Sequence, residues 1–247
     1  MDFPNVTVAE IEIKDIDDWL RALDVAPITR NNFRRLLIVL FNFAVQRGYA
    51  KSNPAKATDK AKVVGEAPGI LTVQQTARLL EAASPELLPY LAIGAFAGLR
   101  RAELERLDWS DIDFDSGLIE VTAENAKTAR RRHVTIQSNL REWLLPVRKH
   151  KGNLTSGENF RQAFDAARVS AGIMEWPNNA LRHSFASYHL AHFKDAKALA
   201  LEMGHTNENM IFTNYRELVK PRDAASYWNI APAAAGKKIV QFAARAE

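Results

Sequence analysis

The sequence predicts a mainly α-helical protein with one small antiparallel β-sheet, arranged as two unequal domains. Along most of the 247-residue chain, apolar residues recur three and four positions apart, which is the helical period. Between residues 111 and 136 the period changes to two, which is typical of strands. Residues 51–70 are rich in proline, glycine and lysine and lack periodicity, so they are predicted to be a linker. We therefore expect domains at residues 1–50 and 71–230, followed by a tail at residues 231–247.

Composition limits the class of protein. With 47% hydrophobic and 25% charged residues, the chain can bury a sizeable core. It has no cysteine, which excludes disulfides, thiolate zinc sites and cysteine nucleophiles. The net charge of +4 and the pI of about 9.3 are compatible with a polyanionic partner. The longest apolar run, Leu36–Phe41, is far shorter than the roughly 20 residues that span a bilayer, and the N-terminus is acidic, so we expect a cytoplasmic protein without a membrane segment.

The first domain is predicted to be helical. Thr7 and Glu10 form a capping-box pattern ahead of an amphipathic segment at residues 15–23, which predicts one helix or two short ones. Thr29 is placed to cap a longer helix that ends at Gly48. One face of this longer helix carries its apolar residues: Phe33, Leu36, Leu37, Leu40, Phe41 and Ala44. Such a face needs a partner to be buried.

The second domain is predicted to begin with three helices. Thr72 and Gln75 form another capping box, which marks the start of the first. The apolar stretch ELLPYLAIGAFAG predicts a buried helix that ends at Gly98. The next segment, RRAELERL, predicts a short amphipathic helix.

Two antiparallel strands are predicted next. An Asp-Ser-Gly turn at residues 115–117 precedes an alternating segment, and residues 132–136 form a second strand candidate. Residues 124–131, ENAKTARR, form a basic hairpin tip between the two. The rest of the domain has helical periodicity, over residues 138–149, 157–171, 179–192, 195–203, 208–218 and 222–228.

Common cofactor and metal motifs are missing from the sequence. It contains no glycine-rich phosphate loop of the Walker or dinucleotide type and no His-Glu-x-x-His helix. His189 and His192 lie one turn apart and could share a metal. No acidic third ligand is near them in the sequence, so ordinary core or surface histidines are favoured. We therefore expect neither a cofactor nor a metal.

Five polar residues stand out by their contexts: Arg100, Lys127, Arg182, His205 and Tyr215. Singly, each has an ordinary structural explanation, such as a solvated helix arginine or a core aromatic. In order and with their flanks, they resemble the tyrosine recombinase (phage integrase) family. The resemblance covers about residues 7–230 and implies a DNA breaking and rejoining catalytic domain, preceded by a short all-helical, core-binding-like domain. The segments that carry it are GLRRAELERLDWSDID, AKTARRRHVTI, LRHSFASYHLA and LEMGHTNENMIFTNYREL.

The resemblance implies that Arg100 and Arg182 hold the phosphate that is cleaved. Attack on a DNA phosphodiester builds negative charge on the non-bridging oxygens, and a guanidinium offers parallel, permanently protonated donors to them. Arg182, in the first turn of its predicted helix, would add the positive end of that helix. Glu103, three residues after Arg100, would either hold an arginine in place or be a solvated helix carboxylate.

The resemblance makes Tyr215 the nucleophile, which forms a covalent 3'-phosphotyrosyl link. A phenol has a pKa near ~10, so it must lose its proton as it attacks, and neighbouring cations favour this loss. Lys127, on the hairpin, is expected to protonate the departing 5' oxygen. His205 is expected to donate a hydrogen bond to a non-bridging oxygen or to steady the tyrosine.

The sequence departs from the family's pattern at Asn179. The usual motif places a histidine or lysine three residues before the second arginine, where it is assigned to proton transfer, and asparagine cannot titrate. Asn178 or Asn179 is a suitable N-cap for the helix of Arg182. We expect Asn179 to cap this helix and to contact the phosphate, leaving proton removal to water or to a neighbour such as His205. His205 and Tyr215 are ten residues apart, where many members have nine. The first domain is also shorter than the usual four helices, so the chain is either a fragment of a longer integrase or has an incomplete DNA clamp.

The implied function is site-specific recombination of double-stranded DNA, which suits DNA integration by a mobile element. A homotetramer on DNA is expected, and a monomer when free. The basic segments KTARRRH and RKHK would lie against backbone phosphates. Two alternatives remain open: a type IB topoisomerase-like enzyme that relaxes DNA, and a catalytically inactive DNA-binding relative. The tail would dock on a neighbouring subunit, or else pack on its own domain or stay disordered.

Overall fold

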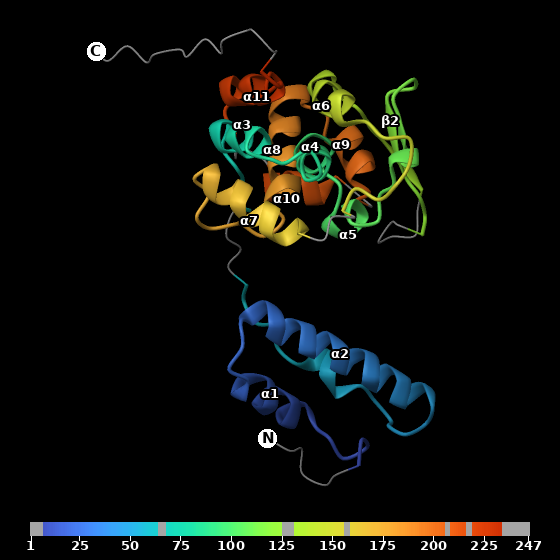
Figure 1. The fold of residues 1–247 in the computed structure, drawn as a ribbon. Coiled ribbons are helices and arrows are strands. Elements are labelled where there is room, and N and C mark those ends of the chain that lie inside the picture. The colour runs from blue at the N-terminus through green and yellow to red at the C-terminus, as the bar shows by residue number, and fades with distance from the viewer. Residues whose placement is uncertain are drawn as a thin grey trace, which may run out of the picture. The chain divides into compact units, whose positions relative to one another are not determined.

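The computed structural model describes residues 7–63, 68–124, 131–155, 159–205, 208–215 and 219–233. The chain divides into two compact units, Met1–Glu66 and Ala67–Glu247 (Figure 1). None of the helices in the described ranges is long and apolar enough to cross a membrane. Most of the predicted tail, from residue 234 onward, lies outside these ranges.

The first unit has a small helical core. It contains α1 (Ile13–Ala22), α2 (Pro27–Gln46) and a 3-10 helix, η1 (Pro54–Ala57). Ile16 and Leu20 of α1 pack with Phe41 of α2 and Ala55 of η1, and all four side chains are buried. These side chains come from all three elements, so η1 completes the core that the two longer helices begin.

The two helix starts predicted for this unit are wrong. Thr7 and Glu10 close a turn, in which the Glu10 carboxylate accepts hydrogen bonds from the Thr7 backbone N–H at 2.7 Å and hydroxyl at 2.8 Å. The helix α1 begins later, because the backbone N–H of Glu12 donates to a carboxylate three residues further on, at 2.9 Å. The helix α2 begins at Pro27 rather than at Thr29, since the fixed φ of proline suits the first helical position.

The predicted apolar face of α2 is buried only in part. Phe41 and Ala44 are buried, but Leu36 and Leu40 are 59% and 50% exposed. The elements that pack on α2 in this unit, α1 and η1, are short and cover only one side of it. The expectation that the face needs a partner is therefore met for only some of its residues.

Part of the predicted linker belongs to the first unit. Ala55 is fully buried, and the Arg34 guanidinium of α2 donates to the Thr58 carbonyl oxygen at 2.9 Å. The Asn31 side chain exchanges two hydrogen bonds with the backbone of Ala61, both at 2.9 Å. This segment has no helical period, but side chains of α2 satisfy its backbone polar groups and hold it in place. The first part of the predicted linker therefore packs within the first unit.

The second unit is mainly helical, and its described residues include one three-stranded antiparallel sheet, which confirms the predicted fold class. Its helices are α3 (Val73–Glu81), α4 (Leu88–Ala97), α5 (Arg101–Leu104), α6 (Ser138–Leu144), α7 (Phe160–Ser170), α8 (Ala180–Phe193), α9 (Ala196–Met203), α10 (Asn209–Tyr215) and α11 (Pro221–Trp228). Its strands, in sheet order, are β1 (Ile112–Asp113), β2 (Leu118–Val121) and β3 (Arg132–Thr135).

Local sequence signals determine where several of these elements begin and end. The Thr72 hydroxyl accepts from the Gln75 backbone N–H at 3.1 Å, which confirms the predicted cap of α3. The helix α4 ends at Gly98, which has the left-handed φ of 62° that glycine tolerates. The helix predicted over residues 138–149 is shorter, because Pro146 cannot continue the α-helical ladder and the chain turns into a 3-10 helix there. The strand β1 is an addition to the two predicted strands.

The two central helices, α4 and α8, approach each other closely. A Cβ atom at Gly94 would lie 2.7 Å from Leu181 Cδ1, and one at Gly98 would lie 2.2 Å from Phe185 Cδ1. The absence of both Cβ atoms therefore allows the two helices to pack at this distance. The helix α8 also packs against α9, α10 and α11 (Figure 1). Its first turn is thereby fixed beside the C-terminal end of α4.

Candidate active site

Arg182 lies in the first turn of α8 and is 8% exposed. Its Nη1 donates to the Gly98 carbonyl oxygen at 2.7 Å, and its Nη2 donates to that of Met203 at 2.8 Å. Burial lowers the pKa of Arg182 to about 10, and the positive charge of Arg100 adds to this effect. The side chain therefore remains a cation at neutral pH, held in one orientation by the backbone of two other segments.

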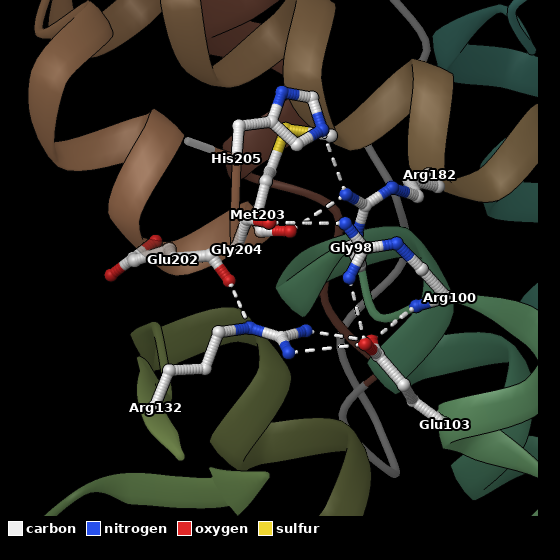
Figure 2. Close-up of polar contacts among 9 residues, drawn as sticks. All are labelled: Gly98, Arg100, Glu103, Arg132, Arg182, Glu202, Met203, Gly204 and His205. Atoms are coloured by element: carbon white, nitrogen blue, oxygen red, sulfur yellow. Dashed lines mark hydrogen bonds and ion pairs between the residues drawn. The ribbon is translucent and has the colours of Figure 1, made fainter. Parts of the chain in front are cut away.

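The C-terminal end of α9 presents three consecutive carbonyl groups, and each accepts from a different arginine (Figure 2). Arg132 Nε donates to the Glu202 oxygen at 2.7 Å. Arg182 and Arg100 donate to the next two carbonyl oxygens along the chain, at 2.8 and 3.2 Å. The last carbonyls of a helix lack intrahelical partners and carry its partial negative charge. The helix end thus gathers three guanidinium groups from three parts of the chain.

Glu103 supplies the full negative charge of this cluster and is 1% exposed. Its carboxylate accepts two hydrogen bonds from the Arg132 guanidinium, at 3.1 and 2.6 Å. It also accepts from the backbone N–H and from Nη1 of Arg100, both at 2.8 Å. Burial opposes the charge on Glu103, but the hydrogen bonds and charges of Arg132 and Arg100 outweigh it and lower the pKa of the carboxyl. Of the two interpretations of Glu103 from the sequence, the solvated helix carboxylate is therefore wrong.

The sequence predicts Arg132 only as part of a basic segment, and this role is not among the predictions. The available signal was the period of two in β3, because Arg132 lies on the same face as Val134, which is fully buried. An arginine in phase with a buried strand residue needs a buried partner. Its partner, Glu103, lies far away in the sequence and only the fold brings it there.

His205 follows the end of α9 and contacts Arg182. The distance from its Nε2 to Arg182 Nη2 is 3.0 Å. Because a guanidinium can only donate, Nε2 accepts this hydrogen bond and the ring proton is on Nδ1. Among the described residues, this buried Nδ1 has no hydrogen-bonding partner. Burial lowers the pKa of His205 to about 4, and the charges of Arg182, Arg100 and Arg132 add to this effect, so the ring is neutral.

Tyr215 is the last residue of α10 and is 5% exposed. Its hydroxyl oxygen lies 2.9 Å from Nδ1 of His183, the residue that follows Arg182 in α8. Burial raises the pKa of Tyr215, while the charges of Arg182 and Arg100 act in the opposite direction. Burial lowers the pKa of the half-buried His183, and the charge of Arg182 adds to this effect. His183 is not among the predicted site residues, and its only signal in the sequence is its position directly after Arg182.

Asn179 is the residue before α8, and its side chain is exposed. Its backbone is left-handed, with a φ of 52°, a region that asparagine enters more readily than most residues. Its carbonyl oxygen accepts from the His183 N–H at 2.9 Å, but its side chain makes no capping hydrogen bond. Asn179 is therefore the N-cap residue of α8, as predicted, but its side chain does not make the expected capping hydrogen bond. With Trp176 and Arg182, Asn179 lines a groove of about 340 Å³.

The structure brings four of the predicted site residues into one region: Arg100, Arg182, His205 and Tyr215. Lys127 lies outside the described residues. The pairing of His183 with the Tyr215 hydroxyl adds a titratable group that the sequence analysis did not include. The arrangement can hold an anion beside a phenol whose proton has an acceptor in contact.

Residues 70–221, more than half of the chain, match the model of the Phage integrase family. The chain belongs to this family. IntQ of Escherichia coli (strain K12), which is named a defective protein, is 24% identical over 236 residues, covering 76% of this chain and 59% of IntQ. Tyrosine recombinase XerC of Xanthomonas axonopodis pv. citri (strain 306) is 28% identical over 210 residues, covering 75% of this chain and 67% of XerC. The chain thus spans about two thirds or less of the length of these two relatives.

Solved structures of integrases share the fold of this family member. A lambda integrase (75–356) dimer bound to a COC' core site aligns with a TM-score of 0.66 and 19% identity, covering 88% of this chain and 86% of that one. The Tn1549 transposon integrase (aa 82–397) in complex with circular intermediate DNA aligns with a TM-score of 0.67 and 20% identity, covering 89% and 85%. A lambda integrase tetramer bound to a Holliday junction aligns with a TM-score of 0.66 and 20% identity, covering 87% and 67%.

Proposed function

We propose that this protein is a site-specific tyrosine recombinase that cleaves and rejoins DNA strands through a 3'-phosphotyrosyl link at Tyr215. One observation carries the proposal. The guanidinium groups of Arg100 and Arg182 donate to adjacent carbonyls, and the Tyr215 hydroxyl is hydrogen-bonded to the residue next to Arg182. Two fixed cations beside one phenol are what attack on a phosphodiester needs. Membership of the phage integrase family supports the same reaction.

The two arginines would stabilise the charge that develops on the phosphate. A guanidinium has five N–H donors, and Arg182 uses three of them, for two backbone carbonyls and His205, which leaves two for a phosphate oxygen. Because these bonds and Glu103 already fix both side chains, little reorganisation is needed when DNA binds. The loss of one such donor typically lowers the rate about a hundredfold or more.

The chemical step would be a transesterification. The Tyr215 oxygen attacks phosphorus, the bond from phosphorus to the 5' oxygen breaks, and Lys127 is proposed to protonate that oxygen. The phosphotyrosyl ester keeps the energy of the phosphodiester, so rejoining by the 5' hydroxyl needs no nucleotide cofactor. Neutral His205 carries its proton on Nδ1, which could donate to a non-bridging oxygen after a ring rotation.

The proposed partner is double-stranded DNA, bound by a homotetramer. The structural relatives include a lambda integrase dimer on a core site and a tetramer on a Holliday junction. The basic segments at residues 127–133 and 148–151 are proposed to contact backbone phosphates, so that binding weakens as salt increases.

A covalent trapping assay tests the proposal. The probe is a library of randomised duplexes, each with a nick close to every candidate cleavage position, so that the short released strand diffuses away and the adduct accumulates. The wild-type protein should form an adduct that survives denaturation, and Tyr215→Phe should form none. Tyr49→Phe, at a tyrosine that is 63% exposed, is the matched control and should form the adduct. Adducts with Tyr215→Phe would disprove the role of this tyrosine.

A second candidate function is DNA binding without catalysis. Asn179 favours it, because this exposed amide stands where the family's pattern has a titratable residue. The similarity to IntQ, which is named a defective protein, also favours it. In this case the wild-type protein would retain duplexes in a binding assay but form no adduct with any of them.

A further inference from the structure

The hydrogen bond between His183 and Tyr215 places a proton acceptor directly on the proposed nucleophile. The Nδ1–Oη distance is 2.9 Å, and the ring centroids are 5.6 Å apart with an interplanar angle of 43°. His183 lies in the first turn of α8, whose backbone is fixed by packing against α4 and α10. Two packed helices therefore hold the two rings in register, and no loop movement is needed for contact.

The other polar groups of the site are poor acceptors for this proton. Arg100 and Arg182 can only donate. The His205 ring uses Nε2 to accept from Arg182 and carries its proton on Nδ1, so it has no free lone pair. Asn179 cannot titrate, and its side chain is exposed. Within the described part of the chain, His183 is the hydrogen-bonding partner of the Tyr215 hydroxyl.

The charge state of His183 suits an acceptor. Burial and the neighbouring charge of Arg182 lower its pKa, so the ring is neutral at pH 7 and can accept at Nδ1 with its proton on Nε2. A DNA phosphate bound to Arg182 would offset part of that positive charge. The affinity of His183 for a proton would then rise when substrate is present, which is the moment at which the proton must move.

We propose that His183 accepts the proton of Tyr215 during strand cleavage, in place of the residue that the family's pattern puts at position 179. The inference rests on the proposed function. In the step, the Oη–H bond breaks and an Nδ1–H bond forms, the Oη–P bond forms, and the bond from phosphorus to the 5' oxygen breaks. The 5' oxygen takes a proton from Lys127. In rejoining, the 5' hydroxyl attacks phosphorus and returns its proton to Lys127, the Oη–P bond breaks, and the imidazolium returns its proton to the Tyr215 oxygen.

His183→Asn is the variant that separates proton transfer from hydrogen bonding. The amide oxygen of asparagine stands near the place of Nδ1 and can accept a hydrogen bond, but it cannot accept a proton. On a trapped duplex selected with the wild-type protein, single-turnover cleavage by His183→Asn should be about 10²- to 10⁴-fold slower. His192→Asn, at an exposed position of the same helix, should cleave at the wild-type rate. If His183→Asn cleaves as fast as the wild type, the inference is wrong.

Chemical rescue provides a second, independent readout. His183→Ala leaves a space beside Tyr215, and imidazole added to the solution can enter it and accept the proton. Cleavage by His183→Ala should therefore increase with imidazole concentration, whereas Tyr215→Phe should not respond. A His183→Ala protein that binds the duplex and is as active as the wild type without imidazole would contradict the inference.

A sulfur substrate distinguishes removal of the nucleophile's proton from protonation of the leaving group. With sulfur in place of the bridging 5' oxygen, the strand departs as a thiolate and needs no proton. This substrate should restore cleavage by Lys127→Ala but not by His183→Asn. Restoration of His183→Asn would assign His183 to the leaving group and overturn the inference.

The pH profile completes the test. His183 faces Arg182 and Tyr215, with Arg100 and His205 in the same cluster. Wild-type cleavage at subsaturating DNA should not slow until the pH is below the ordinary histidine value of 6.5, because the pKa of His183 is lowered and only a protonated ring cannot accept a second proton. A wild-type protein that forms no adduct with any duplex disproves both the proposed function and this inference. Wild-type adducts with an unaffected His183→Asn variant disprove this inference alone.

Discussion

Arg100 and Arg182 donate to the carbonyl oxygens of two consecutive residues, Gly204 and Met203, at 3.2 and 2.8 Å. Two neighbouring guanidinium groups repel each other, and the partial negative charge at the end of α9 offsets part of this repulsion. The full charge of Glu103 offsets more of it. The pair of cations is thus assembled before a phosphate arrives, and the phosphate does not have to bring them together.

The first prediction concerns Glu103. The change Glu103→Gln keeps the shape of the side chain but leaves Arg132 and Arg100 without their carboxylate. Loss of one partner of a buried ion pair costs about 3–5 kcal/mol, so urea denaturation should show a fall in the free energy of unfolding of that order. The control is Glu105→Gln, whose exposed pairing with Arg101 should contribute at most about 1 kcal/mol. Equal losses in the two variants would show that the Glu103 cluster is not stabilising.

The second prediction concerns the packing that supports Arg182. Gly98 has a left-handed φ of 62°, and a Cβ there would lie 2.2 Å from Phe185. Gly117 has a φ of 70°, but a Cβ there would meet no atom within 4 Å, so Gly117→Ala has only the backbone cost of about 1–2 kcal/mol. Gly98→Ala should cost a further ~1–3 kcal/mol for the overlap and should displace the carbonyl that orients Arg182. Thermal or urea unfolding of the two variants measures the difference, and equal stabilities would contradict the prediction.

The strongest local signals in the sequence predicted most of the second unit and part of the site. The Thr72 cap and the Gly98 stop depend on residues within one turn, so a single sequence contains all the information. Arg100 and Arg182 were found from the order and flanks of their motifs rather than from any spacing between them. Their meeting at the end of α9 depends on tertiary packing, which no local pattern records.

The features that sequence reasoning missed are tertiary in the same sense. The position of His183 beside Tyr215 depends on how α8 packs against α10. The role of Arg132 depends on β3 lying against the end of α9. Asn179 was expected to act through its side chain, whereas its left-handed backbone is what the start of α8 uses. Side-chain chemistry alone could not distinguish these two uses of an asparagine.

The third prediction is a loss of stability in mild acid. Burial lowers the pKa of His205 from 6.5 to about 4, and the pKa of His183 is also lowered. Between pH 6.5 and about 4 the unfolded chain therefore binds protons that the folded chain does not, so the free energy of unfolding should fall as the pH falls through this window. The lowered pKa of Glu103 adds a loss only at lower pH, since its stabilisation is complete above the ordinary value of 4.5.

Urea denaturation at several pH values checks this prediction. His205→Gln should reduce the dependence of stability on pH without abolishing it, because buried His189 also has a pKa lowered to about 4. A wild-type stability that is constant from pH 7 to pH 4.5 would contradict it. So would an unchanged slope in His205→Gln.

The last prediction returns a titratable group to position 179. Histidine is among the residues that tolerate a left-handed backbone, so Asn179→His should fold without a large loss of stability. If the family's pattern puts its proton-transfer group here, Asn179→His should raise cleavage at least about tenfold in the His183→Asn background, because it supplies the missing acceptor. In the wild-type background the gain should be small, since His183 already contacts Tyr215. Single-turnover cleavage by the four combinations measures the coupling, and equal gains in both backgrounds would mean that the two positions do not share a role.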